Sequence, residues 1–136
     1  MRVILDTNIL ISALIRRDSV PDRIVQAWLG GRFDVITHER QLDELRTVTR
    51  RPELRGLLRP VEAGRVINQL RDYAEILGRL PRTHRSADPA DDFLLAMCES
   101  GSADYLVTGD KPGLLQLETH GRTAIVTARF FVDLIS

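Results

Sequence analysis

Two aspartates each follow a short apolar run, and together they could bind a metal ion. Asp6 follows Val3-Ile4-Leu5, and Asp110 comes three residues after Tyr105-Leu106-Val107. A short, bounded apolar run is typical of a buried strand in a parallel sheet. The carboxyl ends of parallel strands meet at one edge, where ligands bind in open α/β sheets. We therefore expect Asp6 and Asp110 to face the same crevice, although Asp6 or Thr7 could equally cap the helix that follows.

Further acidic residues lie in two predicted helices. Asp91 and Asp92 belong to an acidic helix start that Asp88 caps, with Pro89 in the first turn. Glu44 lies between the apolar positions of an earlier helix, where a solvated helix face is the competing interpretation. Four carboxylates in one partly buried cleft would repel one another unless divalent cations occupied it. Oxygen ligands without a nearby His or Cys favour Mg²⁺ or Mn²⁺ over zinc, and two such ions can promote in-line phosphoryl displacement.

The Asp91-Asp92 doublet offers two candidates for one metal ligand. Neighbouring helical residues project about 100° apart, so the two carboxylates should not do the same job. Asp91 lies four residues before Leu95 and seven before Cys98, on the face that continues into the core. We expect Asp91 to ligate metal directly and Asp92 to act at longer range or through water. The competing role for Asp91 is a capping box with the backbone N–H of Asp88.

Strands and helices that alternate along the chain must position these residues. The predicted strands cover residues 3–5, 33–36, 105–107 and 124–126, and residues 76–77 could be a strand or the end of a helix over 61–77. One predicted helix directly follows the first strand, and a second covers residues 20–29. A third begins after a Thr37 cap and is interrupted at Pro52. Later helices are predicted over residues 88–100, through 114–117 and over 128–134. This order predicts a single domain over residues 1–136: a three-layer α/β/α fold with a central parallel sheet of about four to five strands.

The composition is that of a globular chain without disulfides. Of its 136 residues, 43% are hydrophobic, 28% are charged, and the formal net charge is zero. The only cysteine, Cys98, lies in an apolar run, so we expect a buried thiol and a reducing compartment. Asp6 and Asn8 interrupt the N-terminal apolar stretch, which is therefore no export signal, and no run is long enough to span a membrane. We expect a cytoplasmic protein.

The acidic motifs, taken in chain order, resemble those of the PIN-domain family. They are Asp6-Thr7-Asn8, Glu44, Asp88-Pro89-Ala90-Asp91-Asp92 and Val107-Thr108-Gly109-Asp110-Lys111. That family is a compact α/β/α nuclease whose three or four acids hold Mg²⁺ or Mn²⁺, and it typically cuts single-stranded RNA. The resemblance implies that the catalytic, metal-binding acids are Asp6, Glu44, Asp91 and Asp110, with Asp92 as a rival of Asp91. It also implies that Thr7, Asn8 and Thr108 orient these carboxylates.

The order and spacing of the motifs look most similar to the toxins of toxin–antitoxin pairs (VapC-like ribonucleases). That subgroup implies an RNA substrate, a cognate antitoxin protein as partner, and a homodimer. Nothing in the residues themselves separates a toxin from a housekeeping ribonuclease.

Positive charge is concentrated in the first part of the chain. Residues 1–87 hold 16 arginines and 11 acids, and Lys111 is the only lysine. Arginine suits phosphate, although a GC-rich genome would also favour it. Arginines near helical spacing could follow an RNA backbone, form a solvated stripe, or contact an acidic antitoxin tail: Arg46, Arg50, Arg51, Arg55 and Arg59. Of these we name Arg46 and Arg50 as RNA-binding candidates, together with Lys111.

Three other interpretations compete with a nuclease. A haloacid-dehalogenase-like phosphatase also begins with a strand that ends in an aspartate, but it needs a second aspartate where this chain has Asn8. A receiver-type signalling domain also gathers acids around Mg²⁺, but it has no use for Glu44. A non-enzymatic binder could keep the fold, although here all four acid positions are filled.

Overall fold

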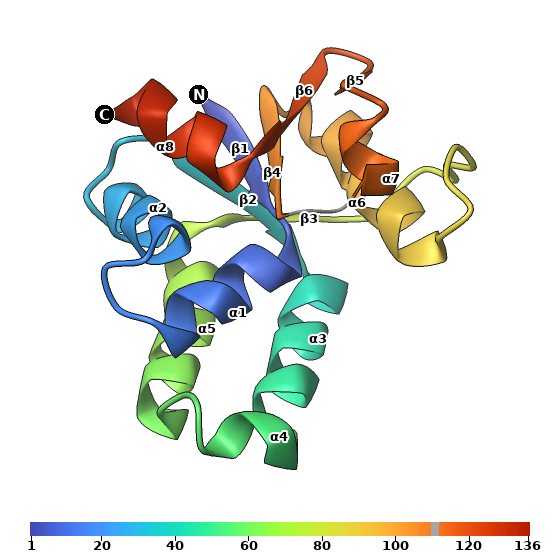
Figure 1. The fold of residues 1–136 in the computed structure, drawn as a ribbon. Coiled ribbons are helices and arrows are strands. Elements are labelled where there is room, and N and C mark those ends of the chain that lie inside the picture. The colour runs from blue at the N-terminus through green and yellow to red at the C-terminus, as the bar shows by residue number, and fades with distance from the viewer. Residues whose placement is uncertain (110–111) are drawn as a thin grey trace.

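A six-stranded sheet runs through the middle of the molecule (Figure 1). The computed structural model describes residues 1–109 and 112–136. The described strands are β1 (Arg2–Leu5), β2 (Asp34–His38), β3 (Glu75–Leu77), β4 (Tyr105–Thr108), β5 (Thr119–His120) and β6 (Thr123–Thr127). Their order is β3-β2-β1-β4-β6-β5, and every pairing is parallel except that of β5 with β6.

Helices cover both faces of this sheet. The described helices are α1 (Thr7–Ile15), α2 (Val20–Leu29), α3 (Glu39–Thr49), α4 (Pro52–Arg55), α5 (Pro60–Tyr73), α6 (Pro89–Gly101), α7 (Pro112–Leu115) and α8 (Ala128–Ile135). One buried apolar cluster joins the sheet to α1, α2, α3, α5 and α8, and a second joins it to α6 and α7. The predicted three-layer α/β/α fold is therefore confirmed. None of the described helices is long and apolar enough to cross a membrane.

The central strands supply both apolar clusters because successive side chains of a strand point to opposite faces. In β1, Val3 and Leu5 belong to the first cluster and Ile4 belongs to the second. In β4, Val107 belongs to the first and Leu106 to the second. Burial on both faces explains why these strands are continuous apolar runs in the sequence.

The direction of α6 brings its first turn to the carboxyl edge of the sheet. Arg2, at the start of β1, donates from Nε to the carbonyl of Gly101 over 2.8 Å. Gly101 is the last residue of α6, so the helix ends at the amino edge of β1. Because α6 packs along β1 and β4, its beginning lies toward the opposite edge, where β1 and β4 end.

The sheet has two more strands than the four listed from the sequence. Residues 75–77 form β3, so the predicted helix over 61–77 ends at Tyr73. Residues 119–120 form β5, which the sequence analysis did not predict. A two-residue turn joins β5 to β6, and Gly121 has the positive φ of 57° that such a turn needs. A strand this short has too few residues to show an apolar period.

The start of α3 also differs from the prediction. Thr37 is still part of β2, and the N-cap is His38, whose Nδ1 accepts the backbone N–H of Arg40 over 3.0 Å. The Thr37 hydroxyl instead donates to Oε1 of Gln41 over 2.7 Å. The predicted N-cap was therefore wrong by one residue. The Thr37 hydroxyl binds the side chain of Gln41 on α3 and does not cap the free backbone N–H groups of the helix.

Candidate functional site

Asp6 lies at the end of β1 and begins α1. Its side chain is only 2% exposed. Oδ1 accepts the backbone N–H of Asn8 over 3.2 Å, so Asp6 is the N-cap of α1. Oδ2 accepts the hydroxyl of Thr108 over 2.8 Å. The capping interpretation is thus correct, and the same carboxylate is also held by the neighbouring strand.

The ends of β1 and β4 are joined by backbone and side chain together. The N–H of Asp6 donates to the carbonyl of Val107 over 2.9 Å, which extends the parallel pairing of Leu5 with Val107 by one residue. Thr108 follows Val107 and is fully buried. This register places the Thr108 hydroxyl beside Asp6, at the carboxyl edge of two central strands.

Glu44 reaches the same edge from α3. Oε2 of Glu44 accepts the hydroxyl of Thr7 over 3.3 Å, and Thr7 directly follows Asp6. The Glu44 side chain is exposed, whereas Thr7 is buried. The structure therefore brings Glu44 to the start of α1, on the same side of the sheet as Asp6, because α1 and α3 pack against each other (Figure 1).

Gln41 connects these groups and was missed in the sequence analysis. It is 1% exposed, and its Nε2 donates to the carbonyl of Leu5 over 2.8 Å and to Oγ1 of Thr7 over 3.4 Å. Gln41 is one helical turn before Leu45, on the buried face of α3. The sequence did contain a signal for this role: Gln41 is a polar residue at a helical position expected to be buried, and a buried polar group needs hydrogen-bond partners.

Asp91 and Asp92 occupy different environments. Asp91 is 6% exposed, and a Cβ built on Gly113 would lie 3.9 Å from its Oδ2. The Asp91 carboxylate therefore lies beside α7, which follows the end of β4. The backbone N–H of Asp88, which a capping box would require, donates to Oγ of Ser86 over 3.1 Å.

Asp92 instead stabilises the segment that leads into α6. Its Oδ1 accepts the backbone N–H groups of Arg85 and Ser86 over 3.0 and 2.8 Å. These two hydrogen bonds lower the pKa of Asp92, because they favour the charged form. Asp92 thus has a local structural role, while the Asp91 carboxylate lies beside Gly113 of α7.

The remaining predicted residues are only partly described. Asp110 and Lys111 lie outside the described residues. Asn8 is exposed and contributes its backbone N–H to Asp6. Arg46 forms an ion pair with Asp43 over 2.8 Å, and Arg50 is exposed just beyond α3. The arginines at 46, 50, 51, 55 and 59 do not form one helical stripe, because α3 ends at Thr49 and α4 and α5 begin separately.

The acids that the structure describes offer oxygen atoms, which are the donor atoms that a hard divalent cation prefers. Among residues 1–109 and 112–136, no three His, Cys, Asp or Glu side chains form a group that could hold a metal ion. Asp6 and Asp91 are nevertheless buried carboxylates, one at the end of β1 and the other in the first turn of α6. Their donor atoms are all oxygens, which are the ligands of Mg²⁺ and Mn²⁺.

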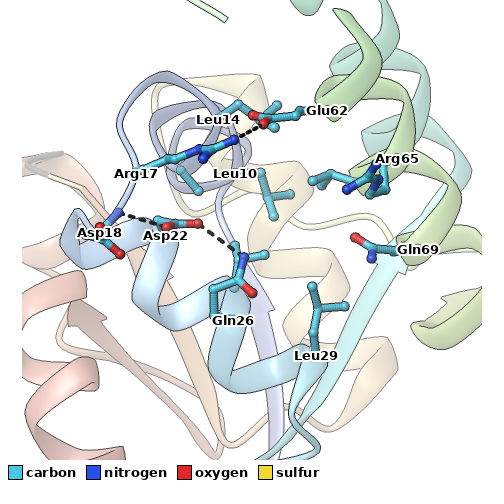
Figure 2. Close-up of a pocket in the computed structure, with 13 residues that line it drawn as sticks. Leu10, Leu14, Arg17, Asp18, Asp22, Gln26, Leu29, Glu62, Arg65 and Gln69 are labelled. Carbon is cyan, nitrogen blue, oxygen red and sulfur yellow. Dashed lines mark hydrogen bonds and ion pairs between the residues drawn. The ribbon is translucent and has the colours of Figure 1, made fainter. Parts of the chain in front are cut away.

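A separate hollow of about 460 Å³ lies between α1, α2 and α5 (Figure 2). Its walls include Leu10, Leu14 and Leu29. Several polar groups of this hollow contact one another: Arg17 pairs with Glu62 over 2.8 Å, and Asp22 accepts from Gln26 and from the backbone of residue 18. None of the predicted acids within the described residues lines this hollow, so it is distinct from the candidate site.

Comparisons with known proteins agree with this architecture. A family model described as PIN domain matches residues 2–112. That range includes β1, α3 and α6, which position Asp6, Glu44, Asp91 and Asp92. Searches of curated proteins and of solved structures found no match to the chain.

Proposed function

The chain belongs to the PIN domain family, and from this premise we propose that it is an Mg²⁺- or Mn²⁺-dependent endoribonuclease that cleaves single-stranded RNA. PIN domains are generally metal-dependent nucleases, so the broader class is a hydrolase that acts on nucleic acid. The observation that carries the proposal is the position of Asp6: a buried carboxylate at the end of a central strand, held on both oxygens.

We propose that Asp6, Glu44, Asp91 and Asp110 would hold the metal. Divalent ions at such a site supply a nucleophilic hydroxide and stabilise charge on the phosphodiester oxygens. The protein's own contribution is orientation. Thr108 and the Asn8 N–H direct the two oxygens of Asp6, and Thr7 directs one oxygen of Glu44. Carboxylates fixed in this way need little reorganisation when a substrate arrives.

We further propose that the protein is the toxin of a toxin–antitoxin pair, with a cognate antitoxin as partner and a homodimer as its working form. The support is the spacing of the acidic motifs, together with exposed apolar side chains on α8. Phe130 and Leu134 are 53% and 46% exposed and lie four residues apart, on one face of that helix. The free, buried thiol of Cys98 supports a reducing compartment such as the cytoplasm.

One assay tests the catalytic proposal against its alternatives. Purified protein is incubated with end-labelled single-stranded RNA, with single-stranded DNA of the same sequence, and with a phosphate monoester. We expect cleavage of the RNA with Mn²⁺ and none with EDTA. Hydrolysis of the monoester alone would favour the phosphatase interpretation, and inactivity on all three substrates would favour a binding domain.

The toxin role needs a separate measurement. Induced expression should arrest growth, and co-expression of the neighbouring open reading frame should restore it. Light scattering coupled to gel filtration should give twice the chain mass of 15.4 kDa. Growth that continues during induction of an active nuclease would indicate a housekeeping enzyme instead.

A further inference from the structure

A hollow of about 430 Å³ lies between the start of α3, the segment before α6, and the first turns of α6. We call it the α6 hollow. Its apolar wall includes Leu80, Pro81, Phe93 and Ala96. Asp92 also lines it, so the hollow lies directly beside the turn that carries Asp91. Its volume is within the range of small-ligand sites, roughly 300–1,000 Å³.

The charged groups of the α6 hollow are mainly positive. Arg40, Arg82 and His84 line it, and the first two are permanently charged. In the part of the chain that the structure describes, neither arginine forms an ion pair with a carboxylate. The carboxylate of Asp92 already accepts two backbone N–H groups, from residues 85 and 86. An anionic ligand would therefore find complementary charge here.

Arg40 lies over the ring of Phe93. Its Cζ lies 4.4 Å from the centroid of the Phe93 ring, and the ring of His38 meets Phe93 edge-on at 5.6 Å. Phe93 is 8% exposed, whereas Arg40 is exposed. The guanidinium group thus lies next to a buried ring and remains accessible to a ligand. Single-stranded RNA bases commonly stack on such arginine planes.

The α6 hollow also adjoins the proposed metal site on its other side. Arg40 and Glu44 are four residues apart on α3, so they lie on one face of that helix. A ligand on Arg40 would therefore lie one helical turn from Glu44, with Asp91 beyond Asp92 on α6. The α6 hollow and the proposed metal site are therefore neighbours on the surface.

Resting on the proposed function, we infer that the α6 hollow binds an unstacked base of single-stranded RNA next to the phosphate to be cleaved. Arg40 stacks on this base, and Arg82 at the rim contacts backbone phosphate. The apolar wall accommodates the faces and edges of the base, and the cations balance the phosphate charge. The hollow would accordingly hold the nucleotide that lies beside the cleavage position.

The test measures binding in metal-free buffer, so that it does not depend on catalysis. A fluorescent single-stranded oligoribonucleotide is compared with versions that carry one abasic nucleotide at each position in turn. With the wild-type protein, we expect one abasic position to weaken binding on the order of tenfold, which is the scale of a lost base-stacking contact. With Arg40→Ala, that penalty should disappear, because the base has lost its stacking partner.

Two further variants separate stacking from charge and from folding. Arg40→Lys keeps the charge without the planar group, so it should also lose the abasic penalty. Arg129→Ala removes an exposed arginine on α8 and should keep it. Arg129→Ala should unfold at the wild-type temperature because the position is exposed, and Arg40→Ala should unfold only slightly below it, because it loses the contact with Phe93. An abasic penalty that is the same in Arg40→Ala and wild type, or no measurable binding of any oligonucleotide, would overturn the inference.

The outcome is distinguishable from that of the proposed function. If the protein shows the Arg40-dependent abasic penalty but does not cleave RNA with Mn²⁺, the base site is supported and the nuclease proposal is contradicted. If the protein cleaves RNA but shows no Arg40-dependent penalty, the nuclease proposal is supported and the base site is contradicted.

Discussion

The Thr108 hydroxyl donates to Oδ2 of Asp6 over 2.8 Å, across two neighbouring strands and 102 positions of sequence. Both side chains are buried. The contact holds the carboxylate at the edge of the sheet that the helices α1, α3 and α6 surround. It links the pairing of β1 with β4 directly to the proposed metal site.

Thr108→Val should impair catalysis more than it impairs folding. Valine has nearly the same shape but cannot hold Oδ2 of Asp6, and loss of such an orienting contact costs roughly 10- to 100-fold in activity or metal affinity. Steady-state cleavage of labelled RNA with Mn²⁺ would measure the effect. Thr123→Val is the matched control, because Thr123 is a buried strand threonine whose hydroxyl bonds the Ala103 carbonyl instead. Equal losses in the two variants would contradict the prediction.

Asp6→Asn should retain the fold and abolish Mn²⁺-dependent cleavage. The asparagine oxygen can still cap α1, and the Thr108 hydroxyl can rotate to accept from the new amide. The substitution nevertheless removes one negative charge from a metal ligand. Circular dichroism and the cleavage assay together check both parts. Asp88→Asn, at the N-cap of α6, is the control for an ordinary capping aspartate. An Asp6→Asn protein that melts early yet cleaves normally would leave Asp6 with the capping role alone.

Asp91→Asn should weaken Mn²⁺ binding more than Asp92→Asn does. The buried Asp91 carboxylate lies beside the start of α7, whereas Asp92 accepts two backbone N–H groups next to its own helix. Isothermal titration with Mn²⁺ would compare the two variants. A larger loss at position 92 would reverse the assignment.

The Asp92 variant should instead change the response of stability to acid. Because the folded-state pKa of Asp92 lies below its ordinary value of about 3.9, its stabilising effect is fully present above that pH. The effect is lost as pH falls through the lower folded-state value. Urea unfolding at pH 7 and at progressively lower pH below 4 should show a smaller acid-induced loss in Asp92→Asn than in wild type. Identical pH profiles would contradict this.

Gln41→Met should destabilise the protein by about 1–3 kcal/mol, which is the usual cost of leaving buried polar groups unsatisfied. Methionine fills a similar volume but cannot bond the Leu5 carbonyl or the hydroxyls of Thr7 and Thr37. Urea denaturation would measure the change. Gln26→Met, on the exposed side of α2, should stay within about 0.5 kcal/mol of wild type. A Gln41 variant as stable as the Gln26 variant would show that this network contributes nothing to folding.

Cys98 should not react with thiol reagents in the folded protein. Burial raises the pKa of this thiol to about 12, because the thiolate is poorly solvated there. At pH 8 the labelling rate should therefore follow the rate of unfolding, and one thiol per chain should react in denaturant. Rapid labelling of the native protein would show that the α6 side of the core opens readily.

Several features of the fold could be predicted because short-range interactions determine them. A few neighbouring residues are enough to determine the strand that ends at Leu5, the caps at Asp6 and Asp88, and the apolar run of α6. Apolar period and capping chemistry act over one helical turn or one strand. Similarly, the location of Cys98 in the core follows from the apolar residues around it.

Other features were decided only by tertiary structure, because their partners are distant in sequence. Whether Glu44 reaches the site depends on its contact with Thr7, and no local pattern distinguishes that position from a solvated helix face. Likewise, Asp91 and Asp92 are identical in type and adjacent, so only the approach of residues 85–86 and 113 separates their surroundings. The α6 hollow also joins segments from three parts of the chain, and such a surface exists only once the helices have packed.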